Sequence, residues 1–159
     1  MPDVVIMGFY AYYKLILGAA ENLIWNQYYF HAYWQAVFDG FHSIPITALL
    51  ALLAFALKRP LFAAFFLSMC IHSFLDLPFH HDDGHRHFFP FSNWRFKSPV
   101  SYWDPFHHGR LFGVFEAAAV ALGCIYLMVR HKAMGSRIVV GTIAATYAVF
   151  LYFVVQMWA

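Results

Sequence analysis

The residues IVVGTIAATYAVFLYFVVQMWA, 138–159, decide the fold of this 159-residue chain. The stretch carries no charged side chain. About 20 consecutive apolar residues are enough for a helix to cross the hydrocarbon core of a membrane. The stretch therefore predicts a transmembrane helix over 138–158, and with it a membrane protein.

The composition of the whole chain agrees with this prediction. Hydrophobic residues make up 62% of the chain and charged residues 11%, whereas about 25% of the residues in a soluble domain are charged. The formal net charge is only +2, and the basic residues are spread along the chain rather than gathered in one patch. We therefore expect the lipid bilayer, and not a nucleic acid, to be the main partner.

Four further apolar segments precede the C-terminal one, and they cover residues 4–25, 44–57, 61–77 and 111–129. Together they predict an all-α fold, a polytopic helical membrane bundle with about five membrane segments. We expect a single domain over 1–159, with a histidine-rich folded loop at 78–110. The Lys-Arg-Pro turn at 58–60 predicts that the second and third segments form an antiparallel hairpin.

The distribution of lysine and arginine predicts which side of the membrane each connection faces. On one side of the five-segment arrangement, all charged residues of the short turns are basic, namely Lys58, Arg59, Arg130, Lys132 and Arg137. Short cytoplasmic turns are typically rich in Lys and Arg, so these turns are predicted to be cytoplasmic. The connection at 26–43 and the histidine-rich loop would then lie on the non-cytoplasmic side.

Histidine is the residue type that points to chemistry. The chain has ten histidines, and seven of them fall between residues 72 and 108. His72 and Asp76 are four residues apart, so on a helix they share one face. An imidazole and a carboxylate held together suit zinc or another borderline divalent metal. The alternative is a hydrogen bond between them that only fixes helix packing.

Other histidines and acidic residues should converge on the same end of the bundle. His42 opens the second apolar segment, Asp3 stands at the mouth of the first, and a His-His doublet follows the helix that carries His72. The predicted metal ligands are His72, Asp76, His42, His80, His81 and Asp3. The predicted alternative ligands, or partners that orient a ligating imidazole, are His85, His87, His107 and His108.

The remaining charged residues suggest catalytic and binding roles. Glu116 is a carboxylate inside the fourth apolar segment, and we expect it or Asp104 to act as a proton acceptor. The alternative for Glu116 is an ion pair with Lys14. Arg86 and Arg95 are expected to bind an anion, either a phosphate oxyanion of a substrate or lipid headgroups.

One long stretch, HSFLDLPFHHDDGHRHFFPFSNWRF at 72–96, resembles the signature of the inner-membrane metal-dependent hydrolase family. In that family a helix with S-H-x-x-x-D is followed by W-P-F-S and a basic-aromatic R-F. His72 and Asp76 match the His and Asp of the helix, and FPFS at 89–92 matches W-P-F-S. The run SPVSYWDPFHHG at 98–109 resembles a subgroup sometimes labelled cobalamin-biosynthesis proteins.

Two weaker matches extend the resemblance toward the N-terminus. FHSIPITALL at 41–50 is similar to the T-H-S segment and places His42, and MPD at 1–3 is similar to L-P-D and places Asp3. The second aspartate of the family's P-D-x-D falls on Val5, and the first histidine of its H-R-x-x-T-H-S falls on Val37. The resemblance therefore implies a metal-dependent hydrolase of the bacterial inner membrane whose ligand set departs from the usual one.

Three functions follow from these residues. The first is a hydrolase that holds one divalent metal, with zinc as first choice, and acts on an amphiphilic ester, such as a phosphoester, reached from the bilayer. The second is a non-catalytic metal-binding or structural subunit of a homo-oligomer or larger membrane complex. The third is a metal or proton transporter. Neither an HxxHH box of the di-iron desaturases nor a G-x-S-x-G nucleophile elbow occurs in the chain.

Overall fold

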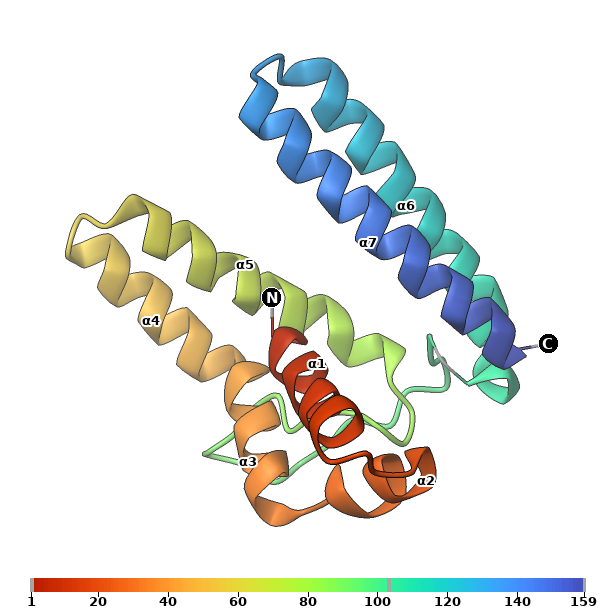
Figure 1. Cartoon of the computed structure of the whole chain (residues 1–159). Coiled ribbons are helices and arrows are strands. Elements are labelled where there is room, and N and C mark those ends of the chain that lie inside the picture. Colours follow the sequence, from red (N-terminus) through yellow and green to blue (C-terminus); the bar gives the residue numbers. More distant parts are fainter. Residues whose placement is uncertain (1, 103, 159) are drawn as a thin grey trace. The chain divides into compact units, whose positions relative to one another are not determined.

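The computed structural model describes residues 2–102 and 104–158, apart from the side chains of 153, 154 and 156–158. Its regular elements are helices, and the described residues form no strand (Figure 1). The all-α prediction is therefore confirmed. The chain divides into two compact units, Met1–Ser98 and Pro99–Ala159, and each is described by itself. The single domain over 1–159 stays a prediction.

A helical hairpin forms the long part of the first unit (Figure 1). Helix α4 (Ile44–Ala56) begins after Ser43, whose hydroxyl accepts a hydrogen bond from the Ile46 amide at 3.2 Å. This is a standard N-cap contact. Lys58 turns the chain with a φ of 54°, and helix α5 (Pro60–Asp76) starts at a proline, which fits the first turn of a helix. The hairpin predicted from the Lys-Arg-Pro turn is confirmed.

The prediction of one membrane segment over 4–25 is wrong. Helix α1 (Val4–Ala11) continues as the π-helical turn η1 (Tyr12–Ile16) and stops. Gly18 has a φ of 63°, a left-handed conformation that glycine adopts without steric cost. The chain then enters helix α2 (Glu21–Leu23) and the π-helical turn η2 (Ile24–Tyr28). The apolar helix that remains is too short to span a membrane alone.

Lys14 forms its ion pair with Glu21, and not with Glu116 as the alternative for Glu116 proposed. Lys14 Nζ lies 2.9 Å from Glu21 Oε1, across the break that follows η1. Tyr10 and Trp25 also donate hydrogen bonds to the Glu21 carboxylate, at 2.8 and 3.2 Å. Glu21 therefore joins α1 to the segment after the break.

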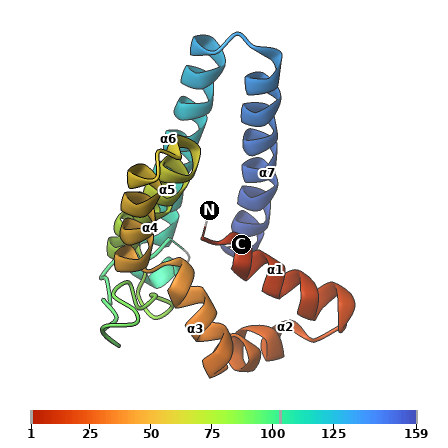
Figure 2. The ribbon, with the colours of Figure 1, turned by 90° about the vertical axis from the view of Figure 1, so that its left-hand side faces the viewer.

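The segment expected to be a connection at 26–43 contains a third helix, α3 (Ala32–Phe41). Its Trp34 and Phe38 rings pack on Phe9 of α1, with ring centroids 5.1 and 5.4 Å apart. Figures 1 and 2 show α1, α2 and α3 next to one another near the start of α4. This aromatic core fixes α3, and α3 carries Gln35 and Asp39 into buried positions.

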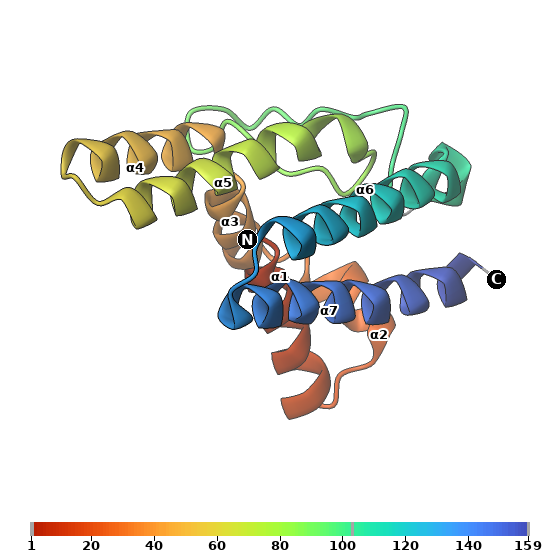
Figure 3. The ribbon, with the colours of Figure 1, turned by 90° about the horizontal axis from the view of Figure 1, so that it is seen from above.

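The loop that follows α5 is folded against the starts of other helices. A single 3-10 turn, η3 (Leu77–Phe79), ends α5 around its proline. Beyond it, the carbonyl of His87 accepts a hydrogen bond from the Ile44 amide at 2.9 Å, and the carbonyl of Phe89 accepts one from Ser43 Oγ at 2.5 Å. Figure 3 shows the loop running beside α4 and α5. The part of the loop that carries His87 is therefore held at the junction of α3 and α4.

The second unit is a helical hairpin preceded by a short turn. The turn η4 (Pro105–His107) is capped by Asp104, which accepts a hydrogen bond from the Phe106 amide at 2.8 Å. Helix α6 (Gly109–Arg130) begins at a glycine because a Cβ there would lie 2.7 Å from the Asp104 carbonyl oxygen. Helix α7 (Met134–Trp158) packs on α6. Both C-terminal apolar segments are therefore helical, as predicted.

Three helices are long and apolar enough to cross a membrane, namely Pro60–Phe79, Gly109–Arg130 and Met134–Tyr152. Their mean hydropathies over the best window are 1.6, 2.0 and 1.5. Helices α3 and α4 meet at an angle of 46° and would provide a fourth span if they act as one. By length and composition the described residues thus provide three or four spans.

Candidate metal centre

His42 occupies the junction between α3 and α4 and is fully buried. Its Nδ1 lies 2.8 Å from the carbonyl oxygen of Phe38. Because a carbonyl can only accept, Nδ1 must carry the proton, and the lone pair is on Nε2. That atom lies 3.3 Å from Asp3 Oδ1. A histidine whose other nitrogen is fixed by a backbone carbonyl is the usual arrangement of a metal ligand.

Two groups of ligand atoms share this histidine. In one, atoms of Asp3, His42 and His72 all lie within 4.8 Å of one another, and in the other the same holds for His42, Asp76 and His85. The five residues come from the start of α1, the junction of α3 and α4, α5 and the loop. Segments far apart in the sequence therefore bring three imidazoles and two carboxylates to one place.

The group of Asp3, His42 and His72, called the outer group below, reaches the surface. The side chains of Asp3 and His72 are 39% and 29% exposed, and Asp3 Oδ2 lies 3.3 Å from His72 Nε2. Burial raises the pKa of Asp3, but the neighbouring His42 and His72 outweigh it, and the net pKa falls below its usual value. Asp3 is therefore a carboxylate at neutral pH.

The group of His42, Asp76 and His85, called the inner group below, is buried. The rings of His42 and His85 stack, with centroids 3.8 Å apart. Burial lowers the pKa of His85 to about 4, and the nearby His42 acts in the same direction, against the opposing effect of Asp39. His85 is therefore neutral at pH 7 and keeps a lone pair for a metal.

His80, a predicted ligand, supports Asp76 and belongs to neither group. Its Nε2 lies 2.8 Å from Asp76 Oδ1 and its Nδ1 lies 2.9 Å from Asp83 Oδ2. Burial alone would lower the pKa of His80, but the hydrogen bonds to Asp76 and Asp83 raise it to about 10. Both nitrogens are therefore protonated at pH 7, so His80 orients the Asp76 carboxylate and offers no lone pair.

His87 is a buried imidazole close to Asp76 of the inner group. Its side chain is 2% exposed, and neither ring nitrogen makes a hydrogen bond within the described part of the chain. Its Nε2 lies 3.9 Å from Asp76 Oδ2, which is too long for a hydrogen bond. A buried polar atom without a partner is costly. Imidazole nitrogens and carboxylate oxygens in this number suit a divalent metal such as zinc.

Other predicted ligands lie apart from both groups. His81 Nδ1 is 2.6 Å from the carbonyl oxygen of Ser98, a contact that ties one end of the loop to the other. The structure therefore brings together Asp3, His42, His72 and Asp76 as the sequence predicted. It adds His85, which the sequence offered only as an alternative ligand or supporting partner.

The predicted residues Asp104, His107, His108 and Glu116 are in the second unit. Asp104 Oδ2 lies 2.6 Å from His107 Nδ1, and His108 precedes α6 with a φ of 63°. Glu116 lies on α6 and interacts with Tyr147 of α7. The roles of Asp104 and Glu116 as proton acceptors stay predictions.

Asp39 is a charged residue that the sequence reasoning missed. Its side chain is fully buried, and it accepts hydrogen bonds from the Arg86 amide, at 2.9 Å, and from Arg86 Nε. Arg95 Nη2 lies 3.4 Å from Asp39 Oδ2, the oxygen that also accepts from Arg86 Nε. A carboxylate on a largely apolar helix is a signal that could have found it. Its partners are 47 and 56 residues away in sequence, so spacing could not identify them.

Comparison of the chain with protein-family models, with curated proteins and with solved structures gave no match.

Proposed function

We propose that this chain is an integral membrane metal-dependent hydrolase that acts on an amphiphilic ester. Its metal centre would consist of the inner and outer groups, with His42 as the shared ligand. Zinc is the first choice of metal because the donors are imidazole nitrogens and carboxylate oxygens. The resemblance of residues 72–96 to the inner-membrane metal-dependent hydrolase family supports the same reading of His72 and Asp76.

The observation that carries the proposal is the convergence of the two groups on His42. His42 is fully buried, its tautomer is fixed by Phe38, and both groups include it. A histidine that served only helix packing would not need acidic and histidine side chains from three other segments around it. The unpartnered nitrogens of His87, one of them 3.9 Å from Asp76 Oδ2, support a cation next to the inner group.

The protein's own residues would prepare the centre for hydrolysis. His80 donates to Asp76 and fixes the orientation of its carboxylate. Asp39 Oδ1 lies 3.7 Å from His85 Nδ1. A divalent metal in this place would supply Lewis-acid polarisation of an ester oxygen and a water of lowered pKa. The partial exposure of Asp3 and His72 gives the outer group access for a substrate.

The bilayer is the proposed surrounding of the helices. The spans bury only 17%, 6% and 6% of their apolar windows inside the molecule, and lipid is the medium in which such helices are stable without further cover. A substrate that reaches the centre from the membrane plane would be amphiphilic. We place the chain in a bacterial inner membrane, with the histidine-rich loop on the non-cytoplasmic side.

A labelling experiment tests this orientation. Reporters fused after Arg59 or after Lys132 are expected to read cytoplasmic, because these basic turns should stay on the inner side. A cysteine at Ser92, in the loop, is expected to react with an impermeant maleimide from outside intact cells. Labelling of position 92 only after lysis, together with an external reading of the fusions, would contradict the orientation.

An activity assay tests the hydrolase function. Purified chain in detergent is expected to hydrolyse a phosphoester or carboxyl ester of an amphiphile, to lose this activity to a chelator and to regain it with zinc. His42→Ala should be inactive, and His131→Ala, at an exposed position in the second unit, should match the wild type. A zinc-loaded wild type that hydrolyses neither class of ester would leave the non-catalytic metal-binding subunit as the better function.

A further inference from the structure

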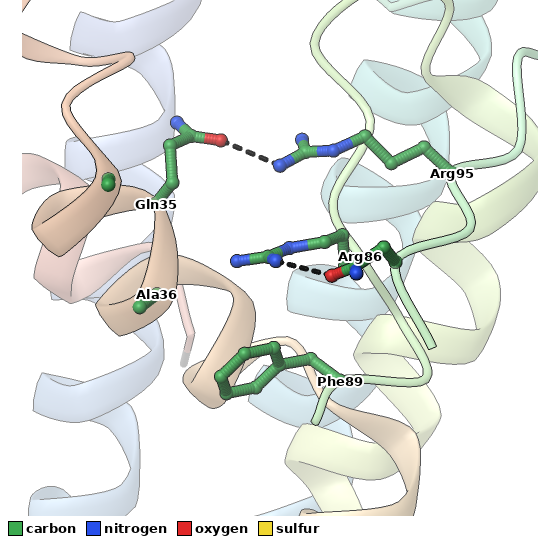
Figure 4. Close-up of a pocket in the computed structure, with 7 residues that line it drawn as sticks. Gln35, Ala36, Arg86, Phe89 and Arg95 are labelled. Carbon is green, nitrogen blue, oxygen red and sulfur yellow. Dashed lines mark hydrogen bonds between the residues drawn. The ribbon is translucent and has the colours of Figure 1, made fainter. Parts of the chain in front are cut away.

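A depression of about 560 Å³ lies between α3 and the histidine-rich loop. Arg86 and Arg95 extend from the loop toward α3, and Gln35 and Ala36 of α3 face them (Figure 4). The residues that line the depression are Ala32, Gln35, Ala36, Arg86, Phe89, Asn93 and Arg95. None of these lining residues is acidic, so the depression presents two guanidinium groups without a carboxylate in its wall.

The charges around the two arginines do not balance. Both contact the same carboxylate, that of Asp39, which is fully buried. Two positive charges beside one negative charge leave one net positive charge at the depression. The side chains of Arg86 and Arg95 are 19% and 33% exposed, so an anion can reach this charge.

Several donors of the arginines are also unused. A guanidinium offers five N–H donors. Arg86 uses Nε for Asp39 and Nη1 for Asn93, and Arg95 uses Nη1 for the Gly84 carbonyl and Nη2 for Gln35 and Asp39. Arg86 Nη2 and Arg95 Nε make no hydrogen bond within the described residues. The Asn93 amide oxygen accepts from Arg86 at 2.8 Å, which leaves the amide nitrogen as a further donor.

The arginines are held in place before any ligand binds. The Arg86 guanidinium stands over the Phe89 ring, 4.8 Å from its centroid. Gln35 accepts from Arg95 at 2.8 Å and is itself fixed by a 2.7 Å hydrogen bond to the Tyr29 carbonyl. Donors that are already positioned lose little conformational entropy when they bind a ligand.

We propose that this depression binds the phosphate group of a ligand. A phosphate presents several oxygens in a tetrahedral arrangement, which suits donors that approach from two guanidinium groups and one amide. A phosphate group carries between one and two negative charges at neutral pH and would offset the net positive charge of the depression. Ala32 and Ala36 leave room beside the donors, and Phe89 offers an apolar wall to the carbon atoms of the ester.

The position of the depression relates this phosphate to the metal centre. Asp39 contacts both arginines on one side and lies 3.7 Å from His85 Nδ1 on the other. The identification of the phosphate with the headgroup of the hydrolase's amphiphilic substrate rests on the proposed function, whereas phosphate binding itself does not. An amphiphile held by its phosphate would thus lie next to the inner group.

The test uses two substitutions that leave every hydrogen bond of the arginines in place. Ala36→Glu puts a carboxylate into the depression, and Ala36→Gln puts in a side chain of the same size without charge. Binding of inorganic phosphate and of lysophosphatidate to the full chain in detergent is followed by ³¹P NMR, after removal of metal with a chelator. The chain should bind the phosphate group, and Ala36→Glu should bind it at least tenfold more weakly than Ala36→Gln.

The outcomes separate this proposal from the proposed function. Absence of binding of both probes, or equal affinities of Ala36→Glu and Ala36→Gln, would overturn the phosphate site. Circular dichroism spectra and size-exclusion profiles that match the wild type would show that both variants fold, and Arg86→Gln, expected to weaken binding at least tenfold, gives an independent check. Tighter binding of lysophosphatidate than of phosphate assigns the group to a lipid, and equal binding assigns it to a soluble phosphate. A chain that binds phosphate and hydrolyses nothing contradicts only the hydrolase function.

Discussion

His42→Ala is expected to weaken the binding of zinc at least 100-fold. His42 is the one residue common to the two groups found among the described residues, so its loss leaves each group with two members. Mutation of a residue that merely orients a ligand costs about 10-fold to 100-fold in metal affinity, and loss of a shared ligand should cost no less. Competition with a chromophoric chelator, on protein purified in detergent, measures the affinity.

Two control variants keep this prediction falsifiable. His42→Asn can still donate a hydrogen bond to the Phe38 carbonyl but lacks the Nε2 lone pair, so it should fold and still lose zinc. His81→Ala removes an imidazole that contacts the Ser98 carbonyl and belongs to neither group, so it should keep zinc. Wild-type affinity in both His42 variants would show that the two groups are not the metal centre.

Asp39→Asn is expected to lower the free energy of unfolding by about 3 kcal/mol, the lower end of the range for breaking a buried ion pair. The substitution keeps the shape of the side chain and an acceptor for the Arg86 amide. It removes the only negative charge that Arg86 and Arg95 contact among the described residues. Two guanidinium groups would then face a buried position without a counter-charge. Equilibrium unfolding of the protein in detergent measures the change.

Asp82→Asn is the matched control for this substitution. Asp82 pairs with Lys97 at 3.0 Å, but the two side chains are 72% and 69% exposed. Exposed ion pairs contribute little because water and salt screen them, so this variant should unfold like the wild type. Equal losses of stability in Asp39→Asn and Asp82→Asn would show that burial of Asp39 among the arginines does not stabilise the unit.

Much of the fold follows from apolar runs and turn residues. The helices α4, α5, α6 and α7 were predictable because each is a long apolar segment. Ser43 marks the start of α4, Pro60 that of α5, and the Pro105 turn with Gly109 that of α6. The break near Gly18 was not, because a glycine in an apolar run is compatible with a continuing helix. Helix α3 was missed because its burial depends on packing against Phe9, a contact made between distant segments.

The candidate site was predictable where the ligands lie on or beside helices. His72 and Asp76 share a face of α5, and His42 and Asp3 stand at helix ends, so regular geometry brings them close. The loop histidines differ, because the path of the loop depends on hydrogen bonds such as that from the Ile44 amide to His87. Because His80 comes directly after the end of the helix, the sequence favoured it over His85 as a metal ligand. In the structure His80 donates a hydrogen bond to Asp76, and His85 belongs to the inner group.

The metal content of the purified wild-type chain tests the metal centre most directly. The protein is exposed to zinc in detergent, passed through a desalting column and analysed by inductively coupled plasma mass spectrometry beside His42→Asn prepared in the same way. The metal-centre assignment predicts that the wild type retains a divalent metal in stoichiometric amount and that His42→Asn retains almost none. A wild type that emerges without metal, or a His42→Asn variant that retains as much as the wild type, would contradict it.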